Sequence, residues 1–295
     1  ISLKKEEQGI LALAADWNIP FCTFGEAELK NAKGTFEESE FVKKNKVNTI
    51  TVFYQHEFVK GNHLDEKLLI SSIEKKIPNK KATGYASLDW EGEALRAVTD
   101  HTEASDFYMK QMIKAIKVAK KMRPHVKWAY FDLPVMSFVT KNGDESNENL
   151  MPLYKELDYL SPSFYLYFNN TFIINQFYAS NAKSILKIAK KLNKPVLPYI
   201  WNRFHPNNGD HAFQLIPDET FDTYLKSFLE VNEAGKKIDG VIWWHSEYYT
   251  YLNKKENKKQ VEAYKEVKDI DTYLNQVFNR YYKRIKSLLK KTSKC

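Results

Sequence analysis

The stretch Gly84-Tyr85-Ala86-Ser87-Leu88-Asp89-Trp90-Glu91 decides how this chain is interpreted, because it joins a buried strand to two acids. Its first part is short, apolar and aromatic and follows the polar run Asn79-Lys80-Lys81, which predicts a buried strand. Residues two apart on a strand point to the same side, so Asp89 and Glu91 would share one space, with Cβ atoms about 6–7 Å apart. Two like charges that close raise the pKa of one carboxyl, which keeps an acid protonated for proton donation. Two solvated acids at a strand end are the alternative interpretation.

Apolar runs alternate with amphipathic segments along the rest of the chain. The predicted strands cover residues 10–17, 49–54, 84–89, 126–133, 159–167, 195–201 and 241–245, and the main predicted helices cover 64–76, 107–122, 184–192, 218–234 and 260–289. Such alternation indicates β/α units and a parallel sheet. Seven or eight units in about 270 residues predict an α/β fold, a single TIM-like (β/α) barrel that is seven-stranded and distorted and spans residues 1–270.

The remaining residues, 271–295, are predicted to form a basic amphipathic helix that packs on the barrel or trails it. The net charge of the chain is +8. No acid occurs from Thr272 onward, and seven basic residues lie there: Arg280, Lys283, Arg284, Lys286, Lys290, Lys291 and Lys294. The excess charge therefore belongs to this segment, and it does not indicate a basic groove for nucleic acid. Val277, Tyr281, Ile285 and Leu288 are the expected packing face.

Cysteine content and hydropathy exclude several classes of protein. The two cysteines, Cys22 and Cys295, form neither a CxxC motif nor a Cys/His cluster, so we expect neither a metal site nor a cofactor. No run of about 18 apolar residues indicates a membrane span. The sequence opens at Ile1 rather than Met, which is consistent with removal of a signal. A secreted or extracytoplasmic monomer is the expectation.

Polar and aromatic side chains occur at the carboxyl end of every predicted strand, which is where (β/α) barrels place their reacting groups. These ends carry Asp16-Trp17-Asn18, Tyr54-Gln55-His56-Glu57, Asp89-Trp90-Glu91, Phe131-Asp132, Tyr165, Trp201-Asn202-Arg203 and Trp244-His245-Ser246-Glu247. An ordinary open α/β sheet does not require such groups at all seven places. We find no glycine-rich phosphate loop and no GxSxG motif.

The residues at these ends resemble the hyaluronidases of glycoside hydrolase family 56, as a divergent, bacterial-type member. The resemblance runs from about residue 10 to about residue 275 and rests on six motifs in order. They are Asp16–Cys22, Gly84–Glu91, Ala119–Pro124 with Trp128–Tyr130, Leu160–Leu166, Val196–Trp201 and Gly240–Trp244. Each motif alone is weak, whereas six in the right order on barrel strands are fairly specific.

The resemblance implies roles for particular residues. Glu91 takes the position of the catalytic acid, Asp89 that of its helper carboxylate, and Tyr165 that of the tyrosine touching the acetamido group. Trp244 takes the position of the tryptophan in the sugar subsite, and Ser163 is a possible substrate contact. By their places on the predicted strands, Tyr54, Tyr130, Asp132 and Trp201 are further candidates for binding substrate.

Several positions depart from the family pattern. Phe131 stands near an expected second tyrosine, and Asp132 stands where a glycine is usual. Gly92-Glu93-Ala94 replaces the usual Trp-Arg-Pro, and the connection from Tyr54 to Gly84 is short. No partner for Cys22 is visible near residues 255–264. These departures bear on hyaluronan as the substrate more than on glycoside hydrolysis.

The spacing of the two acids also predicts a mechanism. Two carboxylates on one face of a strand do not easily straddle a sugar ring, so the 2-acetamido group of the substrate becomes the expected nucleophile. Glu91 would act as general acid and base in an endo-acting, retaining hydrolase of an N-acetylhexosamine polysaccharide of the hyaluronan or chondroitin type. A hydrolase of another amino-sugar glycan on the same barrel and a catalytically silent glycan-binding protein are the alternatives.

Overall fold

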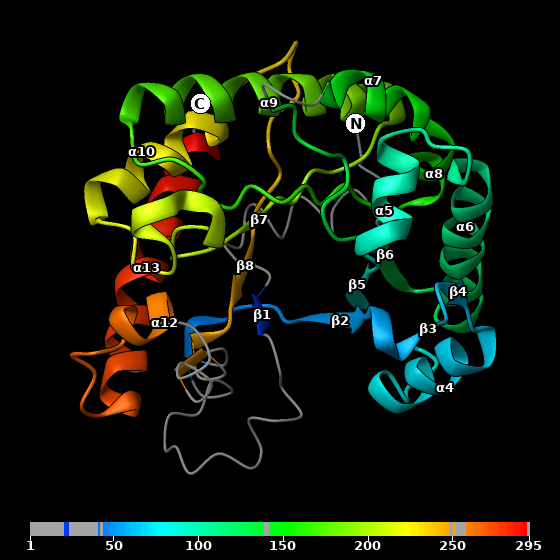
Figure 1. Ribbon diagram of the computed structural model, residues 1–295, viewed down its shortest axis with the longest axis horizontal. Coiled ribbons are helices and arrows are strands. Elements are labelled where there is room, and N and C mark those ends of the chain that lie inside the picture. Colours follow the sequence, from blue (N-terminus) through cyan, green and yellow to red (C-terminus); the bar gives the residue numbers. More distant parts are fainter. Residues whose placement is uncertain are drawn as a thin grey trace. The chain divides into compact units, whose positions relative to one another are not determined.

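The computed structural model describes residues 21–23, 41, 44–138, 142–247, 250–251 and 258–293 (Figure 1). The chain divides into two compact units. The first comprises Ile1–Asn48, Phe164–Lys183 and Ile200–Cys295, and the second comprises Thr49–Ser163 and Ser184–Tyr199. The predicted strand over residues 10–17 and the residues Asp16 and Cys295 lie outside the described part of the chain.

A parallel sheet of three strands organises the second unit. Its order is β2 (Ile50–Tyr54), β5 (Gly84–Asp89) and β6 (Val126–Tyr130), which confirms the strands predicted at these places. Ala86, Ser87 and Leu88 are all fully buried. Burial on both faces is typical of a parallel strand covered on each side, and it explains the continuous apolar character of the segment.

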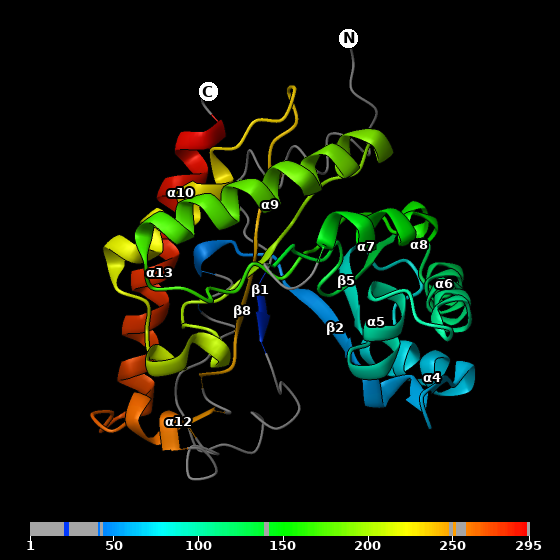
Figure 2. The same ribbon diagram turned by 45° about the horizontal axis from the view of Figure 1, so that its top comes forward.

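Helices and short strands complete the second unit. They are η1 (Gln55–Glu57), β3 (Val59–Lys60), β4 (His63–Leu64), α4 (Glu66–Lys76), α5 (Gly92–Thr99), α6 (Ser105–Met122), α7 (Gly143–Asn149) and α8 (Met151–Glu156). Helix α4 begins where Asp65 accepts a hydrogen bond from the N–H of Leu68 at 3.0 Å, a normal N-cap. Figures 1 and 2 show α4 beside α6, and an ion pair between Glu66 and Lys114 joins them.

The predicted strand over residues 159–167 is wrong as a continuous element. Isolated bridges replace it, at Leu160, Ser161, Ser163 and Leu166. Pro162 has no N–H to donate, which limits any ladder through this segment. Pro195 and Pro198 have the same effect on the next predicted strand, of which only β7 (Tyr199–Ile200) remains regular.

The first unit contains a second small sheet and the longest helices. Its sheet has the order β1 (Phe21–Thr23), β8 (Ile242–His245) and β7, and β1 runs parallel to β8. The other elements are α9 (Thr171–Leu192), which continues from this unit into the other, η2 (Pro206–His211), α10 (Asp218–Leu229), α12 (Lys258–Ala263) and α13 (Ile270–Ser293).

Helix α13 is the predicted basic helix. Its expected packing residues Val277, Tyr281, Ile285 and Leu288 are buried, as the apolar spacing predicts. Arg280 and Arg284 pair with Asp218 on α10, which lies beside α13 in Figures 1 and 2. These ion pairs neutralise two of the basic side chains of α13. The charges of this helix therefore help to hold it against α10 and do not only face solvent.

The described strands give an α/β fold. They form two separate three-stranded sheets and one two-stranded sheet, β3-β4, within the described part of the chain. Closure into a seven-stranded barrel and the domain boundary at residue 270 therefore remain predictions.

Candidate active site

Three residues form a row at the carboxyl end of the sheet in the second unit. Tyr54 and Asp89 are register partners across β2 and β5. Leu88 and Tyr130 are partners across β5 and β6, so the next residue, Phe131, lies on the same side as Asp89. The Phe131 N–H donates to the Leu88 carbonyl at 2.9 Å and continues the ladder to this level. One face of the sheet thus presents Tyr54, Asp89 and Phe131 together.

Glu91 follows two residues after Asp89 and directly precedes α5. Trp90 between them is buried and meets the ring of Phe58 edge-on, with the ring centroids 5.6 Å apart. This contact anchors Trp90 in the core, and the charge of Glu91 still acts on Asp89 across it. Gly92 has φ +66°, a conformation that favours glycine, and it turns the chain from the strand into α5. Glu91 itself is exposed and can meet a substrate.

The environment raises the pKa of both carboxyls. Burial is the main cause of a pKa of about 8 for Asp89, and the negative charges of Glu91 and Asp132 add to it. Desolvation also raises the pKa of Glu91, although its side chain remains exposed on one side. The sequence predicted one raised pKa at Glu91, whereas the larger rise belongs to Asp89 because it lies deeper. Asp89 Oδ1 is buried without a hydrogen-bond partner among the described residues.

The burial of the Asp89 carboxyl should lower the stability of the fold at alkaline pH, and Asp89→Asn should remove this loss. The usual pKa of Asp89 is 3.8 and the folded value is about 8, so folding takes up a proton between these limits. The favourable contribution of the protonated group is complete below about pH 4 and is lost as pH rises through about 8. Asparagine has no proton to lose, so the variant should be more stable at pH 8 by on the order of a few kcal/mol.

Thermal unfolding at pH 4 and pH 8 measures this effect. The gain in unfolding temperature should be several degrees at pH 8 and should shrink toward pH 4. Asp100→Asn, at an exposed position in the same unit, is the control and should show no such gain. An equal change at both pH values would contradict the raised pKa of Asp89.

Asp132 lies close enough to contribute to the same electrostatic cluster. Its φ is +59°, in the left-handed region where glycine is favoured and Asp is tolerated. This conformation gives a physical reason why a glycine would suit the position. The Ser163 N–H donates to Asp132 Oδ1 at 3.3 Å, so the structure brings Asp132 and Ser163 together.

Two of the candidate tyrosines differ sharply in position. The hydroxyl of Tyr130 donates to the Met112 carbonyl at 3.0 Å, and its side chain is only 1% exposed. Tyr130 therefore belongs to the core between β6 and α6, which argues against its predicted role as a substrate contact. Tyr54 is half-buried on the carboxylate side, where Lys76 Nζ lies 5.5 Å from its ring centroid.

In the first unit, aromatic side chains gather around Tyr165. The centroid of its ring lies 5.5 Å from that of Trp244 and 6.0 Å from that of Trp201. The hydroxyl of Tyr178 on α9 donates to the Tyr165 carbonyl at 2.6 Å and holds this segment in place. Trp244 is half-exposed, whereas Trp201 is only 3% exposed. Trp201 therefore packs beneath Trp244 and has little exposed area with which to contact a substrate.

A buried ion pair fixes the two segments that follow these tryptophans. Arg203 donates to both carboxylate oxygens of Glu247, with Nη2 2.6 Å from Oε2, and both side chains are fully buried. Asn202 and the Tyr264 hydroxyl also donate to Glu247, at 2.9 and 2.8 Å. Burial alone would raise the pKa of Glu247, but the Arg203 charge and these hydrogen bonds lower it overall. Glu247 is thus an ionised structural acid.

Sequence reasoning did not single out two residues near the carboxylates. Ser87, two residues before Asp89 on the same strand face, is fully buried, and its hydroxyl has no partner in the described part of the chain. The same i, i+2 rule that joins Asp89 to Glu91 could have found it. Tyr199 meets Phe131 edge-on, with ring centroids 4.9 Å apart, and pairs with Ser163 in a parallel bridge. Only the structure brings Tyr199 to this place.

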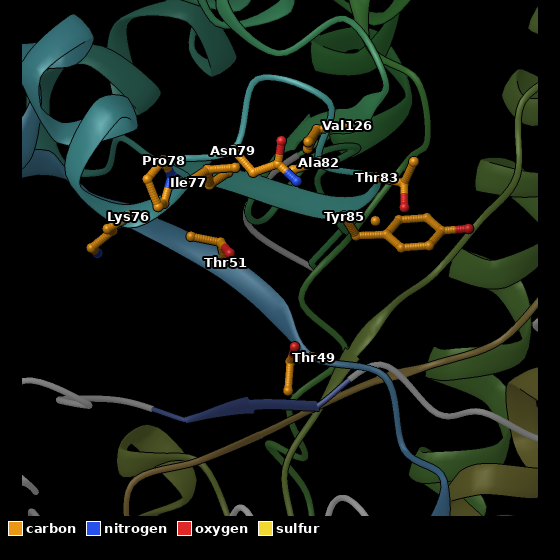
Figure 3. Close-up of a pocket in the computed structure, with 11 residues that line it drawn as sticks. Thr49, Thr51, Lys76, Ile77, Pro78, Asn79, Ala82, Thr83, Tyr85 and Val126 are labelled. Atoms are coloured by element: carbon orange, nitrogen blue, oxygen red, sulfur yellow. The ribbon is translucent and has the colours of Figure 1, made fainter.

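A cavity lies elsewhere in the second unit. It has a volume of about 240 Å³ and is lined from the amino ends of β2, β5 and β6 and from the segment before β5 (Figure 3). Thr51 and Tyr85 line it, whereas Asp89 is at the other end of β5. The cavity is therefore separate from the carboxylates. Among the described residues, no group of three or more His, Cys, Asp or Glu side chains could hold a metal ion.

The α/β fold and the paired acids at a strand end define a candidate glycosidase-type acid–base centre. No family model matches the chain. A hyaluronidase of Apis mellifera is 30% identical over 148 residues, which are 46% of this chain and 36% of the bee protein. The match thus spans about a third of the length of that curated relative.

Solved structures extend this similarity over most of the chain. The crystal structure of bee venom hyaluronidase has a TM-score of 0.64 and 18% identity, and it covers 91% of this chain and 99% of that chain. The structure of the same enzyme with a hyaluronic acid tetramer also gives a TM-score of 0.64, with 92% of this chain covered. The chain is therefore homologous to hyaluronidase in sequence and similar to it in fold, which confirms the resemblance of the strand motifs.

The described helices include none that is long and apolar enough to cross a membrane.

Proposed function

We propose that this protein is an endo-acting, retaining glycoside hydrolase that cleaves an N-acetylhexosamine polysaccharide of the hyaluronan or chondroitin type. The observation that carries the proposal is the pair Asp89 and Glu91 at the carboxyl end of β5, where burial raises the pKa of both carboxyls. A carboxyl that keeps its proton near neutral pH is what a general acid requires. The homology to hyaluronidase supports the same assignment.

In the proposed mechanism the substrate supplies its own nucleophile. The oxygen of its 2-acetamido group attacks the anomeric carbon, and the bond to the leaving oxygen breaks as Glu91 donates a proton to that oxygen. The two carboxyls share one proton below about pH 8, and when that proton is on Glu91, the ionised Asp89 accepts the acetamide N–H and stabilises the positive charge of the cyclic intermediate. Water then opens this intermediate, and Glu91 takes up the proton of that water. Glu91 suits the first and last steps because it is the exposed member of the pair.

The roles of Tyr165 and Trp244 rest on the resemblance. Tyr165 would hydrogen-bond the acetamide oxygen and orient it, and the half-exposed Trp244 would contact the apolar face of a sugar. Asp132, Ser163 and Tyr54 remain candidate substrate contacts. The protein's location outside the cytoplasm and its monomeric state are likewise predictions.

One observation favours the alternatives. Phe131 occupies the row beside Asp89 without a hydroxyl, next to Tyr199. A site with this change could act on another amino-sugar glycan, such as a chitin-like or peptidoglycan-like polymer, or could bind glycans without cleaving them.

A reducing-sugar assay with a panel of polysaccharides separates these functions. Release of reducing ends from hyaluronan or chondroitin supports the proposal, and release from chitin or peptidoglycan alone supports the second enzyme. Binding without release from any member of the panel would identify a glycan-binding protein and would contradict hydrolysis.

The pH dependence of kcat/KM should report the carboxyl pair. The two interacting groups titrate as a unit, and the last proton should leave near pH 8, the pKa of Asp89. Without that proton no general acid remains, so activity should fall above about pH 8. In Asp89→Asn the alkaline limb of the kcat/KM profile should move to lower pH. The negative charge of Asp89 is then gone, so it no longer raises the proton affinity of Glu91. A limb that stays in place would mean that the two carboxyls are not coupled.

A further inference from the structure

His205 stands out in the first unit as a half-buried side chain to which the proposed chemistry gives no role. It follows Phe204, which pairs with Leu166 in a parallel bridge, and its backbone N–H donates to the Leu166 carbonyl at 2.8 Å. This pairing places His205 beside the segment that carries Tyr165 and Tyr167. The position of the imidazole is thus set by backbone hydrogen bonds.

The hydrogen bonds of His205 also fix its tautomer. Nδ1 accepts a hydrogen bond from the backbone N–H of Asn207 at 3.1 Å, so Nδ1 carries no proton. The proton of the neutral ring must then be on Nε2, which has no acceptor among the described residues. Burial lowers the pKa of His205 to about 4, so the ring stays neutral at ordinary pH. His205 therefore presents a single uncharged N–H donor.

Two aromatic rings lie beside the imidazole of His205. The imidazole centroid lies 4.0 Å from that of Tyr167, with 32° between the planes, and 6.3 Å from that of Tyr165. The Tyr165 ring is in turn next to Trp244. An aromatic surface with one neutral donor suits a pyranose, whose C–H face stacks on rings while a hydroxyl or acetamide oxygen accepts a hydrogen bond. An uncharged imidazole forms no ion pair with a uronate carboxylate, so it does not select a uronate by charge.

We propose that His205 is a sugar-contacting residue that donates Nε2–H to an uncharged oxygen of the glycan, beside the aromatic rings of Tyr167, Tyr165 and Trp244. The inference rests on the proposed function and deepens it, because it assigns an uncharged N-acetylhexosamine unit to the aromatic residues around His205. It also gives His205 a role in affinity that the strand motifs do not indicate.

The competing explanation is that His205 serves only as the N-cap of η2, through its bond from Asn207. Two variants separate the roles. His205→Phe keeps an aromatic ring but has neither the donor nor the cap, whereas His205→Asn can still cap the helix but cannot reach as far or stack. A purely capping role predicts that His205→Asn binds glycans as the parent does.

The experiment measures binding by calorimetry in the Glu91→Gln protein, with chitotetraose and hyaluronan tetrasaccharide as probes. The better-bound probe should bind about 3- to 10-fold more weakly to both His205 variants, as expected for one neutral hydrogen bond. His125→Phe, an exposed histidine before β6, is the matched control and should leave affinity unchanged.

The outcomes separate the two levels of the proposal. Parent-like affinity in both His205 variants, or in His205→Asn alone, would overturn the assignment of His205 while leaving the proposed function intact. Failure of the parent to bind either probe would contradict the proposed function, and the inference about His205 would fall with it.

Discussion

Glu91→Gln should lower the rate of polysaccharide hydrolysis by about 10²–10⁴-fold, the typical contribution of a general acid. Glutamine preserves the size of the side chain but has no carboxyl proton to give to the leaving oxygen. Glu91 is exposed and makes no side-chain cap to α5, so the fold should not depend on its charge. The unfolding temperature should therefore stay within a degree or two of the parent, and reducing-sugar release measures the loss.

Glu93→Gln provides the matched control for this variant. Glu93 lies two residues further along, and its carboxylate accepts hydrogen bonds from Tyr108 at 2.9 Å and from Asn62 at 2.7 Å. A glutamine oxygen can still accept one of these bonds, and activity should stay within a few-fold of the parent. If Glu91→Gln retained activity at the level of this control, Glu91 could not be the general acid.

A substrate without its 2-acetamido group should bind but should not be cleaved at a measurable rate. The reason is the predicted same-face placement of Asp89 and Glu91, two residues apart at the end of β5, which would leave neither of them across the sugar ring to act as a nucleophile. If the acetamide is the nucleophile, its removal takes away the first bond-forming step. Initial rates on a polymer before and after chemical N-deacetylation measure the effect, and re-acetylation of the same sample is the control.

Asp132 is the group that could defeat this expectation. It is half-buried, and its charge acts on Asp89, so it is a third acid in the same cluster. Rapid cleavage of the deacetylated polymer would point to Asp132, or another protein group, as the base or nucleophile. Loss of that cleavage in Asp132→Asn would then identify Asp132.

Much of the fold could be predicted because its patterns are local. The strand Gly84–Asp89 was predicted with the bounds of β5, and the apolar spacing of residues 107–122 predicted nearly all of α6. The prediction of a strand over residues 159–167 is wrong because it rests on apolar composition alone. Pro162 interrupts the ladder of hydrogen bonds, and the bridges that do form pair this segment with residues distant in the sequence. Short α5 was missed because it begins at Gly92, a residue that usually ends a pattern.

The side of the strand on which a candidate residue lies could be predicted from alternation within that strand. Which residues of neighbouring strands lie next to each other depends on the register between strands, and this could not be predicted. The i, i+2 rule predicts that Asp89 and Glu91 share one side, and the charge of Glu91 does act on Asp89. The same rule could have separated Tyr130 from Phe131, but only the pairing of Tyr130 with Leu88 reveals which of the two faces the core. The depth of Asp89 relative to Glu91, and the neutral donor of His205, depend on tertiary packing that no local pattern encodes.

In the proposed mechanism the substrate's acetamide, and not a water molecule, attacks the anomeric carbon in the first step. Proton NMR of the product formed in the first minutes of hydrolysis distinguishes these two nucleophiles, because the anomeric signal is read before mutarotation mixes the two forms. Attack by the acetamide followed by water gives two inversions, so the first product should retain the anomeric configuration of the cleaved bond. A first product of inverted configuration would mean that water attacks directly and would exclude the acetamide as the nucleophile.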